Sequence, residues 1–193
     1  MLPDFTPMGL LPPGDYPLSL ADLRNSMLVS GPRALVAAGA WDTIWRAQLV
    51  ENLAALTSQL WQAGIGQVFI NGSFVEDKAH PNDIDGYFET DLAELRSGRL
   101  EAALNAVDPH RAWTWDMARR HFDPDSGKRQ LPLWHAYRVE LYPHVPGLLS
   151  GIRDQYGHEL PFPSAFRQQR DTFAQKGIVR VMKEPARSIG GQP

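Results

Sequence analysis

Two aspartates close together in the sequence carry the clearest chemical signal of this chain. Asp83 and Asp85 stand two positions apart, directly after Pro81 and Asn82. Side chains at i and i+2 point to the same face of a β-strand, so the two carboxylates would face the same way. Like charges on one face repel unless a cation lies between them, and hard divalent cations prefer oxygen ligands. The spacing favours a metal site, whereas the simpler alternative is an exposed turn capped by the aspartates.

A glycine and a serine end the apolar run that precedes these aspartates. Gly72 lets the backbone approach a ligand closely and Ser73 adds a hydroxyl, a combination that suits a phosphate group. Lys78 lies between Ser73 and the aspartates, and its mobile charge could reach the same phosphate. A plain turn and a solvated loop lysine remain the alternatives. Metal and phosphate together predict phosphoryl or nucleotidyl transfer, with Gly72, Ser73 and Lys78 binding the nucleotide.

A third carboxylate is expected, because two carboxylates alone hold two metal ions poorly. Glu140 is the best candidate, since it lies in a short apolar segment that predicts a strand. A buried carboxylate there is costly unless it is paired or bound to metal. A salt bridge to Arg138 is the alternative explanation. We therefore expect Asp83, Asp85 and Glu140 to be the catalytic and metal-binding residues.

The pair Gly72-Ser73 followed by Asp83-Ile84-Asp85 resembles the signature of the polymerase-beta-type nucleotidyltransferase superfamily. More closely, the chain is similar to a bacterial family of uncharacterised, minimal nucleotidyltransferase-like proteins. Three stretches carry the closer resemblance, and they touch most of the chain. They are residues 11–14, the central motif from Gly72 to Asp85, and residues 176–179 after Arg170 and Asp171.

This resemblance implies an activity and its requirements. The enzyme would move a nucleoside monophosphate from a nucleoside triphosphate to a hydroxyl of tRNA, protein or a small molecule, using Mg²⁺ or Mn²⁺. A toxin–antitoxin or phage-defence context is implied, with a cognate partner protein. Two departures from the superfamily pattern, Gly86 after the aspartates and Glu140 in place of an aspartate, motivate the alternative of an inactive module that binds nucleotide or a partner.

The hydrophobic pattern predicts the elements that position these residues. Asp42 should cap a helix whose apolar face carries Trp45 and four leucines, ending at Gly64. A shorter helix should follow Ser19, and helical segments should follow Asp91 and Asp108. Strands are expected over residues 67–71, 84–89, 134–142 and 178–182, a short helix over 146–156, and helical or irregular chain over 162–176.

These elements predict an α/β (α+β) fold, a small mixed β-sheet flanked by helices. We expect an extended N-terminal segment and short helix over residues 1–40, a nucleotidyltransferase-like domain over 41–183 and a flexible tail over 184–193. The 193 residues hold no cysteine, which excludes disulfides and thiolate metal sites, and the net charge is −3. With neither a signal peptide nor an apolar span in the sequence, we expect a cytoplasmic protein without membrane contact.

Overall fold

The computed structural model describes residues 2–184 and is built around a mixed sheet of five strands, ordered β1-β9-β2-β3-β6. The pairs β1–β9 and β3–β6 are parallel, and β9–β2 and β2–β3 are antiparallel. β9, the last strand of the sheet in sequence order, thus lies between β1 and β2. The strands are β1 (Asp15–Ser19), β2 (Val68–Asn71), β3 (Ile84–Glu89), β6 (Val139–His144) and β9 (Ile178–Met182).

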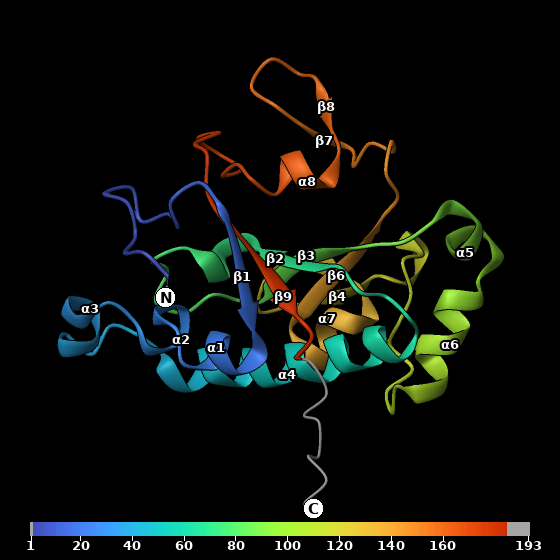
Figure 1. Cartoon of the computed structure of the whole chain (residues 1–193), viewed down its shortest axis with the longest axis horizontal. Helices are drawn as coiled ribbons and strands as arrows, with labels where there is room; N and C mark the ends of the chain where they lie inside the picture. The colour runs from blue at the N-terminus through green and yellow to red at the C-terminus, as the bar shows by residue number, and fades with distance from the viewer. Residues whose placement is uncertain (1, 185–193) are drawn as a thin grey trace, which may run out of the picture.

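One long helix, α4 (Thr43–Gln62), covers one face of this sheet (Figure 1). Asp42 caps it by accepting a hydrogen bond from the backbone N–H of Trp45 at 2.9 Å. Four leucines on its inner face are fully buried and pack with the apolar residues of β2, β3, β6 and β9. The other helices are α1 (Leu20–Arg24), α2 (Met27–Ser30), α3 (Arg33–Ala37), α5 (Leu92–Ser97), α6 (Arg99–Val107), α7 (Pro132–Tyr137) and α8 (Phe162–Ala165).

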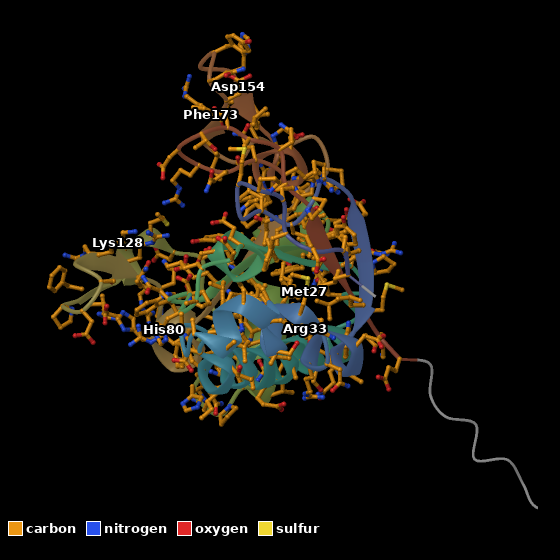
Figure 2. All side chains as sticks on the ribbon, turned by 90° about the vertical axis from the view of Figure 1, so that its left-hand side faces the viewer. Met27, Arg33, His80, Lys128, Asp154 and Phe173 are labelled. Carbon is orange, nitrogen blue, oxygen red and sulfur yellow. The ribbon has the colours of Figure 1, made fainter. Side chains whose placement is uncertain are left out.

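The opposite face of the sheet is more polar and lies beneath the segment 145–177. This segment holds α8 and a hairpin of β7 (Ile152–Arg153) and β8 (Glu159–Leu160), which lie across the sheet from α4 in Figure 1. Asp154 marks its far tip in Figure 2. A small aromatic cluster fixes the segment to the sheet, where Phe162 and Phe166 pack on Tyr87.

A second small hairpin projects from the side of the molecule. It consists of β4 (His121–Asp123) and β5 (Lys128–Gln130), and Figure 2 shows Lys128 on this projection, on the same side as His80. Two short 3-10 helices complete the structure, namely η1 (Gly72–Val75) and η2 (Met117–Arg119). In residues 2–184, no helix combines the length and the apolar character needed to cross a membrane.

The coarse fold prediction is confirmed, since the chain is mixed α/β with a central mixed sheet flanked by helices. The predicted strand over residues 84–89 coincides with β3, and the predicted helix after Asp42 coincides with α4. The helical segment predicted after Asp91 is present as α5 and α6, which are separated at Gly98. The helix predicted after Ser19 is present but is divided into α1 and α2.

Three element predictions are wrong. The segment after Asp108 is irregular rather than helical, because the Asp108 carboxylate accepts hydrogen bonds from His110 and Ala112 N–H groups and so holds a turn. The predicted strand over 134–142 is α7 followed by β6, with Arg138 at φ 53° ending the helix. The short helix predicted over 146–156 is a loop leading into β7.

The first strand belongs to the sheet although it lies in the predicted N-terminal extension. β1 pairs with β9 over five residues, and Leu10 and Leu11 are buried beside it. The predicted flexible tail over 184–193 lies outside the described residues, except for Glu184.

Candidate functional site

The candidate site forms where β2, β3 and β6 lie side by side. Asp85 of β3 pairs with Asn71 of β2 on one side and with Glu140 of β6 on the other. Directly paired residues of neighbouring strands point to the same face, so Asp85 and Glu140 share the polar face of the sheet. Asp83 lies two positions before Asp85 and is half-buried like it. The structure therefore brings together the three carboxylates that the sequence singles out.

Gly72 begins the turn η1 immediately against Asp85. Its φ is +70°, and a Cβ atom added there would lie 2.2 Å from Oδ2 of Asp85. The backbone N–H of Gly72 donates to the Asn71 side chain at 2.7 Å, and the Asn71 amide donates to the Gly177 carbonyl at 2.8 Å. The glycine is thus required both by the backbone conformation and by the closeness of the carboxylate.

The Asp83 carboxylate is held by an indole. Nε1 of Trp134 in α7 donates to Oδ2 of Asp83 at 2.7 Å. Burial raises the pKa of Asp83 above its ordinary value, while the Trp134 hydrogen bond and the nearby charges of Lys78, Lys128 and Arg138 oppose this increase. Desolvation therefore outweighs the favourable partners of this carboxylate.

The pKa of Asp85 is strongly raised. Burial raises its pKa to about 7, and the neighbouring charges of Asp83 and Glu140 add to the increase. Arg170 and Lys176 act in the opposite direction but do not offset it. The ionised form of Asp85 is therefore disfavoured until more positive charge is supplied.

Glu140 is 7% exposed and is held through only one of its oxygens. The Tyr142 hydroxyl donates to Oε2 at 2.5 Å, and Arg120 in turn donates to the Tyr142 oxygen at 3.2 Å. Oε1 is buried without a hydrogen-bond partner among the described residues. The alternative salt bridge is not formed, because the Arg138 guanidinium lies 3.9 Å from the centroid of a Trp134 ring.

The sequence predicts a phosphate-binding role for Ser73 and Lys78, and the structure places both in the segment that leads to Asp83. Ser73 lies in η1 next to Gly72, whereas Lys78 is exposed. Lys176, which begins one of the stretches that carry the resemblance, lies closer to the turn and is buried, so a position on the surface is wrong for it. Lys176 is 5% exposed, and its Nζ donates to the Gly72 carbonyl at 3.1 Å and to Oε1 of Glu76 at 2.6 Å.

The whole segment from η1 to Lys78 is anchored by one buried arginine of α4. Arg46 is fully buried, and its guanidinium donates to the carbonyls of Phe74, Glu76 and Lys78, as well as to that of Leu28. Four backbone acceptors thus pair with its two terminal nitrogens, whereas its buried Nε has no hydrogen-bond partner among the described residues. The sequence does contain a signal for this burial, because the spacing of Arg46 places it on the same helix face as the buried leucines of α4.

The three carboxylates are the type of ligand that a hard divalent cation prefers, but their present positions do not form a metal site. In the part of the chain that the structure describes, no three histidine or carboxylate side chains form a metal-binding group. All three candidates offer oxygen, the ligand that Mg²⁺ prefers, and one of these oxygens is a buried orphan. Asp83 and Glu140 instead each accept a hydrogen bond from an aromatic side chain, Trp134 and Tyr142 respectively.

A cavity of about 240 Å³ lies next to this site. Residue types that line it include aromatic rings, an amide, a hydroxyl and charged groups from four parts of the chain. They are Trp45, His80, Asn82, Asp123, Asp125, Ser126, Trp134 and Arg138. Since Trp134 contacts Asp83 directly, the cavity adjoins the carboxylates on the side of Asp83.

Gly86 has a structural explanation. A Cβ atom at this position would lie 2.3 Å from the carbonyl oxygen of Phe69 on β2 and 2.8 Å from Leu141 on β6. The glycine therefore follows from the close approach of three strands and says nothing against activity.

Comparison with known proteins identifies one family. A family model described as a family of unknown function (DUF6932) matches residues 3–182. No curated protein and no solved structure matches the chain.

Proposed function

The chain belongs to DUF6932, a family of unknown function, and we propose from the chemistry of its site that it is a metal-dependent nucleotidyltransferase. The reaction would transfer a nucleoside monophosphate from a nucleoside triphosphate to an acceptor hydroxyl. One observation carries the proposal: Asp85 of β3 and Glu140 of β6 lie side by side on one face of the sheet. Asp83 lies two positions before Asp85, and Gly72 lies against the Asp85 carboxylate. The turn that we assign to phosphate thus lies directly beside the carboxylates.

Charge supports the same proposal. Burial raises the pKa values of Asp83 and Asp85, neighbouring negative charge adds to the increase at Asp85, and one buried oxygen of Glu140 has no hydrogen-bond partner among the described residues. Mg²⁺ bound by these three side chains would compensate that charge and polarise the phosphate that is attacked. The nucleotidyltransferase-like fold that the sequence resembles requires carboxylates on adjoining strands, and this arrangement agrees with that requirement.

The remaining groups have roles that their positions support. The turn at Gly72 and Ser73 would receive the terminal phosphates, with Arg170 and Lys176 near enough to influence Asp85 electrostatically. In the transfer, the acceptor oxygen bonds to the α-phosphorus, the bond from that phosphorus to the bridging oxygen breaks, and pyrophosphate leaves. The hydroxyl proton passes to solvent. Tyr142 holds Glu140 in place, and Trp134 holds Asp83.

The first experiment is label transfer. The protein is incubated with each α-labelled nucleoside triphosphate and Mg²⁺, together with total tRNA or a cell lysate. We expect label on one RNA or protein band, and its loss in the double variant Asp83→Asn/Asp85→Asn. The variant must unfold cooperatively at a temperature no lower than that of the unchanged protein, which shows that the fold is retained. Transfer by the folded variant at the original rate would contradict the proposal.

A second candidate function is a module that binds nucleotide or a partner without turnover. The observation that favours it is the engagement of two carboxylates with other side chains, Asp83 with Trp134 and Glu140 with Tyr142. A binding module would keep its ligand or partner in the Asp83→Asn/Asp85→Asn variant, whereas the enzyme would lose its product. Isothermal titration with each nucleoside triphosphate, with and without Mg²⁺, separates the two functions.

A further inference from the structure

The cavity beside Asp83 contains two aromatic groups that are already held in position. Trp45, in the first turn of α4, stacks on His80 with ring centroids 5.2 Å apart and planes inclined by 12°. The second group is Trp134 of α7, with the Arg138 guanidinium over its ring. Flat aromatic faces of this kind bind other flat rings by stacking.

Hydrogen bonds fix the orientation of these rings. Trp45 Nε1 donates to the Pro81 carbonyl at 2.6 Å, and Trp134 Nε1 donates to Asp83 at 2.7 Å. The two acceptors flank Asn82, which is exposed and lines the cavity. Nδ1 of His80 is 2.8 Å from the Asp42 carboxylate. Because the rings are held before any ligand arrives, little side-chain entropy would be lost on binding.

The charges around the cavity are mixed: Arg138 lines it, and Lys78 and Lys128 lie near Asp83, which adjoins it. Lys78, Lys128 and Arg138 all lie near enough to Asp83 to lower its pKa. Of the two acidic residues that line the cavity, Asp123 accepts the Ser126 N–H at 2.8 Å and so holds the hairpin turn, whereas Asp125 is exposed. A ligand with a flat polar ring and a phosphate fits this set: the ring stacks, Asn82 meets its edge, and the cations neutralise the phosphate.

We propose that this cavity binds the terminal nucleotide of an acceptor nucleic acid, so that a nucleic-acid end is the acceptor in the proposed transfer. This inference rests on the proposed function. In an in-line displacement the entering oxygen and the leaving pyrophosphate lie on opposite sides of the phosphorus. Gly72, where the terminal phosphates would lie, contacts Asp85, whereas the cavity adjoins Asp83. The cavity is thus at the end of the site where the acceptor hydroxyl enters.

The test is binding of short RNA without metal and without nucleoside triphosphate. RNA trinucleotides with a free 3′ hydroxyl, covering the four terminal bases, are titrated calorimetrically in the presence of EDTA. We expect His80→Ala and Trp45→Leu each to weaken binding about tenfold or more, because a stacked base is lost. His80 is half-exposed at its side chain, so its removal spares the core. The control is Trp61→Phe near the other end of α4, which should bind like the unchanged protein.

The outcomes separate this inference from the proposed function. RNA binding that depends on His80, without any transfer activity, would support the cavity assignment and contradict the enzyme. Transfer to protein alone, with RNA binding unaffected by His80→Ala, would overturn the cavity assignment and leave the enzyme. A nucleoside triphosphate that competes with the RNA, and itself binds less tightly to His80→Ala, would assign the cavity to the incoming nucleotide and also overturn the inference.

Discussion

Among individual residues, Asp85 has the most unfavourable electrostatic environment in the candidate site. Asp83 and Glu140 each accept a hydrogen bond from an aromatic side chain, from Trp134 and Tyr142 respectively. Asp85 has both of these carboxylates as neighbours, and its pKa rises to about 7. A cation bound here would therefore stabilise the ionised form of Asp85 more than that of either neighbour.

Replacing Asp85 by asparagine should stabilise the metal-free protein at neutral pH. With a folded pKa of about 7, the folded state keeps a proton that the unfolded state has already lost, so stability falls as the pH rises from about 4 through 7. Asparagine does not titrate. At about 1.4 kcal/mol per pKa unit the gain is roughly 2–4 kcal/mol at pH 8 and much less at pH 5. Thermal melts in EDTA at both pH values measure it, and an equal gain at both would contradict this argument.

Replacing Gly72 by alanine should damage the site more than the fold. The new Cβ would displace the Asp85 carboxylate, and the positive φ adds strain of about 1–2 kcal/mol. Gly64→Ala is the matched control, because Gly64 has φ +85° but no atom within 4 Å of the added Cβ. Both variants should lose similar backbone stability, and only Gly72→Ala should lose label transfer and metal-induced stabilisation. Equal activity in the two variants would show that the contact with Asp85 is unimportant.

The sequence predicts which carboxylates to examine but not the groups that hold them. The two-residue spacing of Asp83 and Asp85 is a local pattern, and Glu140 is noticeable as a charge in an apolar segment. Trp134 is 51 positions from its partner Asp83 in the sequence, and Lys176 is 104 positions from its partner Gly72. Nothing in the local sequence reports such long-range contacts, and their identity requires the fold.

At the scale of elements, the helix α4 positions the segment that runs from η1 to Asp83. Arg46 extends from the inner face of this helix to four backbone carbonyls, three of which belong to that segment. The guanidinium also lies 3.9 Å from a Trp41 ring centroid. This segment forms a β-bridge between Glu76 and Leu10, and it obtains further hydrogen-bond donors from a helix through this one side chain.

Replacing Arg46 by methionine should therefore strongly destabilise the protein. The methionine would fill part of the space but leave buried carbonyls without a donor, at a cost of about 3 kcal/mol or more. The comparison is Arg24→Met, since Arg24 of α1 is 40% exposed and pairs with the exposed Glu51. That change should cost less than about 1 kcal/mol. Urea denaturation measures both, and equal losses would contradict the proposed role of Arg46.

Elements with a strong hydrophobic period were predictable, and those determined by polar side chains were not. The leucine spacing of α4 and the apolar run of β9 agree with the structure. The segment after Asp108 carries a helix-like start, but Asp108 also accepts a hydrogen bond from the Tyr137 hydroxyl at 2.5 Å and is buried. Its carboxylate is therefore occupied by tertiary contacts, and these contacts override the local preference for a helix.

At the scale of the whole molecule, the N-terminal segment cannot be separated from the sheet. β1 is parallel to β9 over residues Asp15 to Ser19, and Leu23 and Leu28 of the following helices are fully buried in the main core. Removal of residues 1–40 would expose one edge of β9 and one end of α4. We expect the fragment 41–193 to lose its cooperative thermal transition, measured by calorimetry. A transition within a few degrees of that of the full chain would contradict this expectation.

The position of β9 has a consequence for the synthesis of this protein. The strand ends at Met182 and fills the place between β1 and β2, which are both made much earlier. A nascent chain that stops before Gly177 has a gap in its sheet and also lacks the Gly177 carbonyl that accepts the Asn71 hydrogen bond beside the carboxylates. Chains generally fold in units while they leave the ribosome. Here the candidate site can be completed only after β9 has been made, so chains that terminate before this strand would lack the complete site.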